Sequence, residues 1–117
     1  LELPLRESDD EIFRTDWQPL LGMLADHAIE RVRRAELFHA SIARAIAEQA
    51  KALSAHNDIA QIGLCGGVFQ NRVLADQAVA LLEDAGFSVY LPLALPCNDA
   101  ALSYGQAAEI AARETQQ

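Results

Sequence analysis

The sequence is short of aromatic residues, of basic residues and of cysteine, and the last two shortages bear on the class of protein. Aromatic residues make up 6% of the chain, and 9 lysines and arginines stand against 17 acidic residues, for a net charge of -8. Nucleic acids and anionic membranes are bound through basic faces, so we expect neither as a partner. The two cysteines, Cys65 and Cys97, form no metal-type CxxC pair and no disulfide framework, which favours a reducing, cytoplasmic location.

Long apolar runs are also missing. No run approaches the roughly 20 residues that cross a bilayer, and residues 1–10 carry acidic side chains where a secretory leader has basic ones. The chain begins with Leu1 rather than methionine, and we therefore expect a piece of a longer protein. With 117 residues, 51% of them hydrophobic, residues 1–117 suffice for one packed domain or lobe.

Hydrophobic periodicity predicts an α/β fold in which helices flank a partly parallel sheet. Near the N-terminus we expect an antiparallel hairpin of two short strands, residues 1–5 and 12–14, joined through an acidic turn at residues 7–10. Asp16 can cap the following helix, residues 18–26, by accepting from its first N–H groups. The apolar stripe of that helix is predicted to be Leu20, Leu21 and Leu24.

Beyond this hairpin, the pattern alternates between helices and buried strands. The order is strand–helix–strand–helix, and both connections are too long for a hairpin. The two strands are therefore expected to be parallel, with a right-handed crossover. The predicted elements are a long helix at 29–53, a strand at 59–65, a helix at 68–85 stopped by Gly86, a strand at 87–91 and a last helix from Asp99 to about residue 113.

The first candidate site is the glycine-rich loop at residues 65–71, which follows the first parallel strand. Ligands bind beyond the carboxyl ends of strands in open parallel sheets. Gly66 and Gly67 allow a tight turn and a close backbone approach, and the following helix start supplies N–H groups for an anion or a nucleotide. The Asn71 amide can contact a ribose or phosphate oxygen. The alternative is that the glycines only make the turn and Asn71 is a surface helix residue.

The second candidate site is the loop at residues 96–101. Asp99 can bind a hard metal ion or act as a base, but it can equally cap the last helix, because aspartate is a good N-cap residue. Asn98 lies beside it in the same loop. Gly105 is unfavourable inside a helix, so close packing or the approach of a ligand is expected there.

The remaining candidates are a histidine and the two cysteines. His39 lies beside Phe38 on the long helix, and we interpret it as a partly buried histidine with its hydrogen bonds satisfied rather than as a catalytic group. Cys65 and Cys97 lie near the strand ends, but no histidine is close in sequence to activate either thiol. We therefore expect both cysteines to be small buried residues.

Taken together, the two loops resemble a known family. The run Gly66-Gly67-Val68-Phe69-Gln70-Asn71-Arg72, followed by Pro96-Cys97-Asn98-Asp99, is similar to the C-terminal end of the hydrogenase-maturation carbamoyltransferases, the HypF family. The stretch Ala35-Glu36-Leu37-Phe38-His39 resembles the Phe-His helix of this family. The family is also resembled by an earlier stretch, Asp16-Trp17-Gln18-Pro19-Leu20-Leu21. The resemblance runs from about residue 1 to residue 113.

The resemblance implies that residues 1–117 are a C-terminal lobe of a carbamoyltransferase domain, the second lobe of a duplicated actin-like, or ribonuclease H-like, ATPase fold. The whole enzyme would also carry an acylphosphatase-like domain, zinc-finger modules and a carbamoyl-adenylate-forming domain. By likeness it takes a carbamoyl group from carbamoyl phosphate with ATP, through carbamoyl-adenylate. The group passes to the C-terminal cysteine of a HypE-family maturation protein and becomes the cyanide ligand of the [NiFe] hydrogenase iron.

The resemblance also implies roles for single residues. Gly66, Gly67 and Asn71 fall in the nucleotide-contacting loop, and Asp99 matches an aspartate that completes an iron, zinc or other divalent metal site with two histidines of the other lobe. No histidine pair with i, i+4 spacing occurs in this chain, so the lobe alone should hold the metal poorly and be inactive. His39 and Asn98 are weaker site candidates, and no catalytic residue is assigned. Ala100-Ala101 replaces a Gly-Gly pair that is common in the family.

Other functions remain open. A tRNA threonylcarbamoyl-transferase or an O-carbamoyltransferase has a related lobe, although Phe69-Gln70 favours the hydrogenase branch and the acidic charge disfavours tRNA docking. The lobe can instead serve chiefly as a protein-docking module, or belong to an unrelated flavodoxin-like regulator. Separated from its other lobe, it is expected to expose apolar surface and to self-associate.

Overall fold

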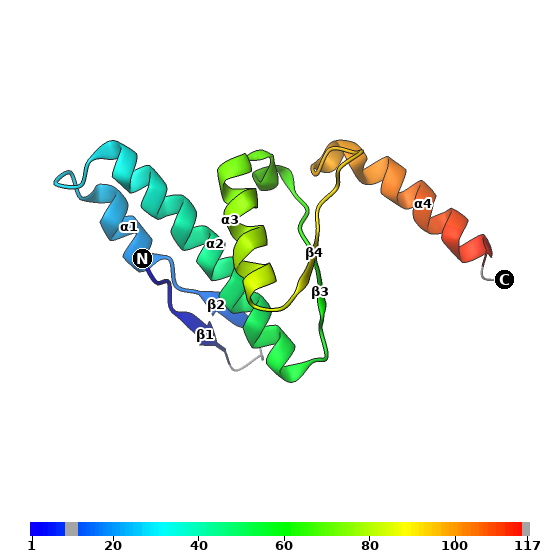
Figure 1. Ribbon diagram of the computed structural model, residues 1–117, viewed down its shortest axis with the longest axis horizontal. Coiled ribbons are helices and arrows are strands. Elements are labelled where there is room, and N and C mark those ends of the chain that lie inside the picture. The colour runs from blue at the N-terminus through cyan, green and yellow to red at the C-terminus, as the bar shows by residue number, and fades with distance from the viewer. Residues whose placement is uncertain (9–11, 116–117) are drawn as a thin grey trace.

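The computed structural model describes residues 1–8 and 12–115, so part of the predicted acidic turn, residues 9 and 10, lies outside the described residues. The described chain is a mixed α/β domain (Figure 1). Its elements in order are β1 (Leu5–Glu7), β2 (Phe13–Thr15), α1 (Gln18–Ala25), α2 (Arg31–His56), β3 (Gln61–Gly63), a 3₁₀ turn (Gly67–Gln70), α3 (Arg72–Asp84), β4 (Ser88–Tyr90), a second 3₁₀ turn (Asp99–Ala101) and α4 (Leu102–Thr115).

Two small sheets confirm the predicted strand directions. β1 and β2 pair antiparallel with Leu5 opposite Thr15, as the hairpin prediction requires, but β1 is Leu5–Glu7 and not residues 1–5. β3 and β4 pair parallel with Ile62 opposite Val89, and α3 forms the crossover between them. The parallel arrangement brings the carboxyl ends of β3 and β4, and therefore the two candidate loops, to one edge of the sheet.

The core lies on two faces of α2, the central helix of the molecule. Alanines on one face allow α3 to approach closely, and the β3–β4 pair lies beyond α3 in Figure 1. The other face packs against the hairpin and α1 through Leu3, Leu20, Met23 and Ala45. The buried residues of the larger cluster are Ala43, Ala47, Ala50, Leu64, Leu74, Ala78 and Leu82.

The prediction that both parallel strands are buried is wrong. Ile62 and Val89 are half-buried against the helical core, whereas the residues on either side of them are exposed, including Tyr90 at 57%. Helices cover only one face of this two-stranded sheet in the described chain. An apolar run indicates that a strand has cover, but it does not say that the cover belongs to the same piece of chain.

Helix starts and ends follow local signals, with two corrections. Asp16 accepts from the N–H of Gln18, the first residue of α1, at 3.0 Å, although the N-cap position itself is Trp17. The buried residues of α1 are Leu20 and Met23 rather than Leu21 and Leu24. The helix predicted from residue 68 begins at Arg72, because a 3₁₀ turn precedes it. Gly86 has a φ of 93° and ends α3 as predicted.

α4 projects away from the rest of the molecule (Figure 1). None of its described residues is buried. The Cα radius of gyration is 17.0 Å, whereas a compact chain of this length has about 13 Å. No helix within the described residues has the length and apolar character needed to cross a membrane.

Candidate functional site

The glycine loop and the Asn98-Asp99 loop meet at the edge of the parallel sheet. The Gly66 N–H donates to the Cys97 carbonyl oxygen at 2.5 Å, so main-chain atoms join the two loops. A Cβ on Gly67 would lie 3.8 Å from the Cβ of Asn98, an ordinary contact. The loops and one face of α4 enclose an open groove, whose lining includes Cys65, Gly66, Cys97, Asn98, Asp99, Leu102, Gly105, Gln106 and Glu109.

Gly66 has a backbone conformation that suits only glycine. Its φ is 112° and its ψ is 151°, in a region where a Cβ is strained. Gly67 then begins the first 3₁₀ turn, which ends at Gln70. The sequence prediction that this loop needs glycine for its turn is therefore confirmed at Gly66.

The cap of the last helical segment is Asn98 rather than Asp99. Asn98 Oδ1 accepts from the Ala100 N–H at 3.1 Å, whereas Asp99 is the first residue of the second 3₁₀ turn. The interpretation of Asp99 as the N-cap is thus wrong. Its carboxylate is exposed at the rim of the groove, where it can serve a ligand.

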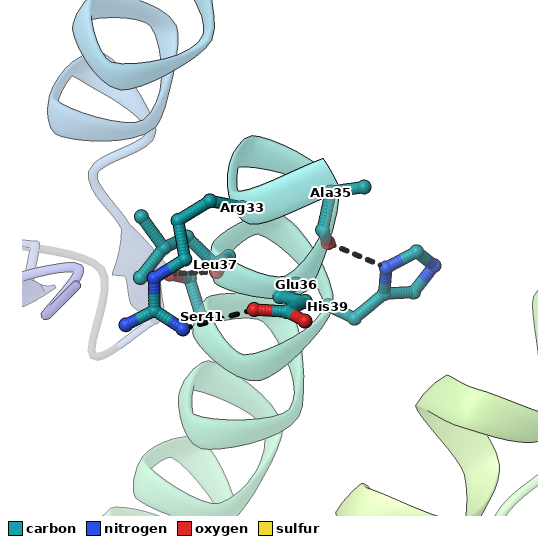
Figure 2. Close-up of polar contacts among 6 residues, drawn as sticks. All are labelled: Arg33, Ala35, Glu36, Leu37, His39 and Ser41. Carbon is teal, nitrogen blue, oxygen red and sulfur yellow. Dashed lines mark hydrogen bonds and ion pairs between the residues drawn. The ribbon is translucent and has the colours of Figure 1, made fainter. Parts of the chain in front are cut away.

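Asn71 caps α3 and contacts α2, so it is more than a surface helix residue. Its Oδ1 accepts from the Leu74 N–H at 3.3 Å, and its Nδ2 donates to His39 Nε2 at 2.8 Å. His39 Nδ1 lies 2.7 Å from the Ala35 carbonyl oxygen, on the side of α2 opposite to Ser41 (Figure 2). The prediction of a partly buried histidine with satisfied hydrogen bonds is confirmed.

Two groups of predicted site residues therefore emerge. Gly66, Asn98 and Asp99 line the groove and Gly67 packs beside Asn98, whereas Asn71 forms its contacts with α2 and α3 and is not among the groove-lining residues. The five-residue run from Gly67 to Asn71 connects the two groups through the first 3₁₀ turn. Whether any of these residues contacts a nucleotide stays a prediction.

The cysteines and Gly105 differ from expectation. Cys65 is exposed and Cys97 half-buried, and both thiols are free, so the prediction of two buried residues is wrong. Both line the groove, in the loops that follow β3 and β4. A Cβ on Gly105 would meet nothing within 4 Å, so close packing does not account for this glycine.

The charge of the groove bears on the ligand it can hold. Its described lining contains two carboxylates, Asp99 and Glu109, and no lysine or arginine. A phosphate group there would need a cation between itself and these carboxylates. Within residues 1–8 and 12–115, no three histidine, cysteine or acidic side chains cluster as a metal site. Asp99 can supply one hard oxygen ligand, and the others would have to come from elsewhere.

Sequence reasoning missed two parts of this region. The contact between His39 and Asn71 joins residues 32 positions apart, and no local pattern signals it. Gln106 and Glu109 were also not predicted as site residues, although Gln106 follows Gly105 in the stretch that resembles the family and both share one helical face with Leu102. Beside His39, a second shallow hollow is lined by Leu24, Arg31, Arg34, Ala35 and Phe38.

The fold and the junction of the loops define a mixed α/β subdomain, and comparison with known proteins identifies its class. Residues 2–106 match the family model described as "Carbamoyltransferase, Kae1-like Domain, second subdomain". The chain belongs to this family, the second Kae1-like subdomain at the C-terminal end of the HypF carbamoyltransferases.

Individual HypF proteins are similar over most of this chain. The carbamoyltransferase HypF homolog of Cupriavidus necator is 37% identical over 96 residues, 80% of this chain and 24% of that protein. Carbamoyltransferase HypF of Rhodobacter capsulatus is 38% identical over 99 residues, 84% of this chain and 13% of that protein. The protein of the same name from Synechocystis sp. is 35% identical over 101 residues, which are 85% of this chain and 13% of that protein. The chain thus spans a small part of these relatives, and no solved structure matches it.

Proposed function

We propose that this chain forms one wall of the nucleotide site in a HypF-type carbamoyltransferase, as the second lobe of an actin-like ATPase fold. The complete enzyme would use ATP and carbamoyl phosphate, form carbamoyl-adenylate and transfer the carbamoyl group to the C-terminal cysteine of a HypE-family partner. The relatives' names as HypF carbamoyltransferases support this branch over tRNA modification or O-carbamoylation.

The observation that carries the proposal is the junction of the two loops. Gly66, in a conformation that suits only glycine, donates to the Cys97 carbonyl oxygen, and this hydrogen bond brings the turn next to Asp99. Small glycine loops beside a helix start allow main-chain atoms to approach a nucleotide closely. The resulting groove opens at the carboxyl ends of β3 and β4, the usual ligand side of a parallel sheet.

Within this proposal, each residue has a task that its surroundings permit. Gly66 and Gly67 would lie along the adenosine and phosphate, and Asn71 would close the same loop at the start of α3. Asp99 would hold a divalent metal ion or iron together with ligands of the other lobe, and the metal would neutralise phosphate charge. The incoming nucleophile would be the partner's cysteine, not Cys65 or Cys97.

One departure from the family narrows this site. Ala101 lines the groove where the family often has glycine, so a methyl group stands near the phosphate path. Direct contact between a phosphate and the main chain is therefore better expected at Gly66 and Gly67 than at Ala100-Ala101. The isolated chain, with one wall and an acidic groove, should bind nucleotide weakly and transfer no carbamoyl group.

The test uses a complete HypF-type protein that carries this chain. Asp99→Ala should lower ATP-dependent carbamoyl transfer on the order of 100-fold, because it removes a ligand of the metal that would neutralise the phosphate charge. Asn71→Ala should lower nucleotide binding as well. Asp84→Ala, an exposed aspartate at the far end of α3, is the matched control and should leave both unchanged. Unchanged ATP binding and transfer in both site variants would refute the site.

A docking role is the second candidate, and the exposure of α4 favours it. Leu102, Tyr104 and Ile110 are each exposed by 60% or more. A pull-down of the HypE-family protein by this chain alone separates docking from nucleotide binding. Retention of the partner by the chain without ATP would support docking, and its loss on Ile110→Asp would place the contact on α4.

A further inference from the structure

One side-chain contact links the long helix to the glycine loop. His39 lies in α2, and Asn71 stands between the first 3₁₀ turn and α3, 32 positions later. Their nitrogen atoms, His39 Nε2 and Asn71 Nδ2, are 2.8 Å apart. The other ring nitrogen, Nδ1, is 2.7 Å from the carbonyl oxygen of Ala35, one turn earlier in α2. Both nitrogens of the imidazole therefore have a partner.

The partners determine which nitrogen carries the hydrogen. A carbonyl oxygen can only accept, so Nδ1 must be protonated where it faces Ala35. Asn71 Oδ1 already accepts from the Leu74 N–H at 3.3 Å, which turns the Asn71 amino group toward the ring. Nε2 must then accept. The network assigns His39 as the neutral Nδ1–H tautomer, since the other neutral form and the imidazolium would each oppose two donors.

Further contacts surround the ring of His39 and the main chain of Asn71. The Phe38 and His39 rings meet edge to face at 5.6 Å, and His39 is half-buried. The Asn71 main chain bonds both neighbours: its N–H donates to Val68 O at 3.1 Å, and its carbonyl accepts from the Ala75 N–H at 3.0 Å. Through its main chain and its side chain together, Asn71 therefore connects the 3₁₀ turn, which starts at Gly67, to α2 and α3.

We infer that His39 is a positioning residue, which acts through Asn71 to hold the glycine loop in the conformation that joins it to the Asn98-Asp99 loop. This inference rests on the proposed function for its purpose, because a nucleotide wall is what the fixed loop would serve. Its geometry does not rest on that function. His39 does not contact the groove itself, and it is not a catalytic residue.

The experiment is nuclear magnetic resonance of the labelled chain without nucleotide. Long-range proton–nitrogen correlations of the His39 ring should identify a protonated Nδ1 and an unprotonated Nε2 in the wild type. This measurement needs no variant and therefore no assumption about folding. A ring protonated at Nε2 would overturn the inference, since Asn71 could not then donate to it.

Two variants separate the halves of the contact. His39→Gln puts an acceptor near the Nε2 position and should keep the Asn71 amide bound, whereas His39→Asn keeps a donor toward Ala35 and loses Asn71. In His39→Asn, exchange of the Asn71 side-chain amide with water should rise about fivefold, the factor that corresponds to one net hydrogen bond of about 1 kcal/mol. The main-chain amide signals of Gly67 and Phe69 should shift in His39→Asn and stay in place in His39→Gln.

Each outcome decides the question. Unmoved Gly67 and Phe69 signals in His39→Asn would show that His39 does not position the loop. Equal shifts in both variants would show that the loop responds to loss of the imidazole ring and not to the Asn71 contact. Shifts in His39→Gln alone would show that the Ala35 contact matters, and either result would overturn the inference. Circular dichroism checks that both variants fold. Because nothing here involves ATP, failure of the proposed function, seen as unchanged carbamoyl transfer in the site variants, is distinguishable from failure of this inference.

Discussion

α3 and α4 are helices of 13 and 14 residues, each preceded by a 3₁₀ turn and an asparagine whose side chain caps the segment, and they end in opposite environments. α3 buries Leu74, Ala75, Ala78 and Leu82, whereas the described residues of α4 bury none. Local signals therefore start a helix, but they do not decide what covers it. A single helix of this length is marginal in water, so α4 is expected to fray more readily than α3.

The largest expected effect breaks the core side of this comparison. Leu82 is 0% exposed, and Leu82→Ala should lower the free energy of unfolding by about 3 kcal/mol through lost burial and a cavity. Ile110, at 60% exposure on α4, is the matched control. Ile110→Ala should change the same quantity by no more than about 0.5 kcal/mol. Urea titration followed by circular dichroism measures both, and equal losses would mean that α4 packs against the core in solution.

A second pair of substitutions compares two glycines. Gly66→Ala should lower the free energy of unfolding by about 2 kcal/mol, because a φ of 112° is strained for a residue with a Cβ. Steric clash is not the cause, since no atom lies within 4 Å of a Cβ built there. Gly105→Ala in α4 also enters open space, and alanine should add about 0.5 kcal/mol to local helix stability. Thermal unfolding checks the first value, and amide exchange along α4 checks the second. A stable Gly66→Ala variant would contradict the described turn.

The smallest pair compares the two asparagine caps. Asn71→Ala should cost about 1 kcal/mol of unfolding free energy, since α3 is part of the core and loses its cap. Asn98→Ala should change global stability by less than about 0.5 kcal/mol, because fraying of an unpacked helix leaves the core intact. Asn71→Asp, which keeps the cap oxygen, controls for the loss of the side chain. Faster amide exchange in α4 alone would mark the Asn98 effect.

Much of the fold could be predicted, because its signals are local. Helix periodicity, the stop at Gly86 and the parallel pairing of two strands on either side of a helix all follow from short stretches of sequence. The meeting of the two loops follows in turn, since the carboxyl ends of neighbouring parallel strands lie at one edge.

The errors have a common physical origin in partners that are distant or ambiguous. The burial of β3 and β4 depends on cover for their outer face, which local sequence does not reveal. The choice between Asn98 and Asp99 as a cap turned on a one-residue register between equally suitable residues. The His39–Asn71 contact required the packing of α2 on α3 before the two side chains could meet.

The hydrogen bond between Gly66 and Cys97 has a consequence for how such a chain can evolve. It is made by an amide and a carbonyl, so the side chain at position 97 has no part in it. Side chains that end in a thiol, a hydroxyl or a methyl group can replace one another there without breaking this hydrogen bond between the loops. Position 66, in contrast, is restricted to glycine, the one residue without a Cβ. Substitutions are therefore expected to be tolerated at position 97 and to be nearly forbidden at position 66.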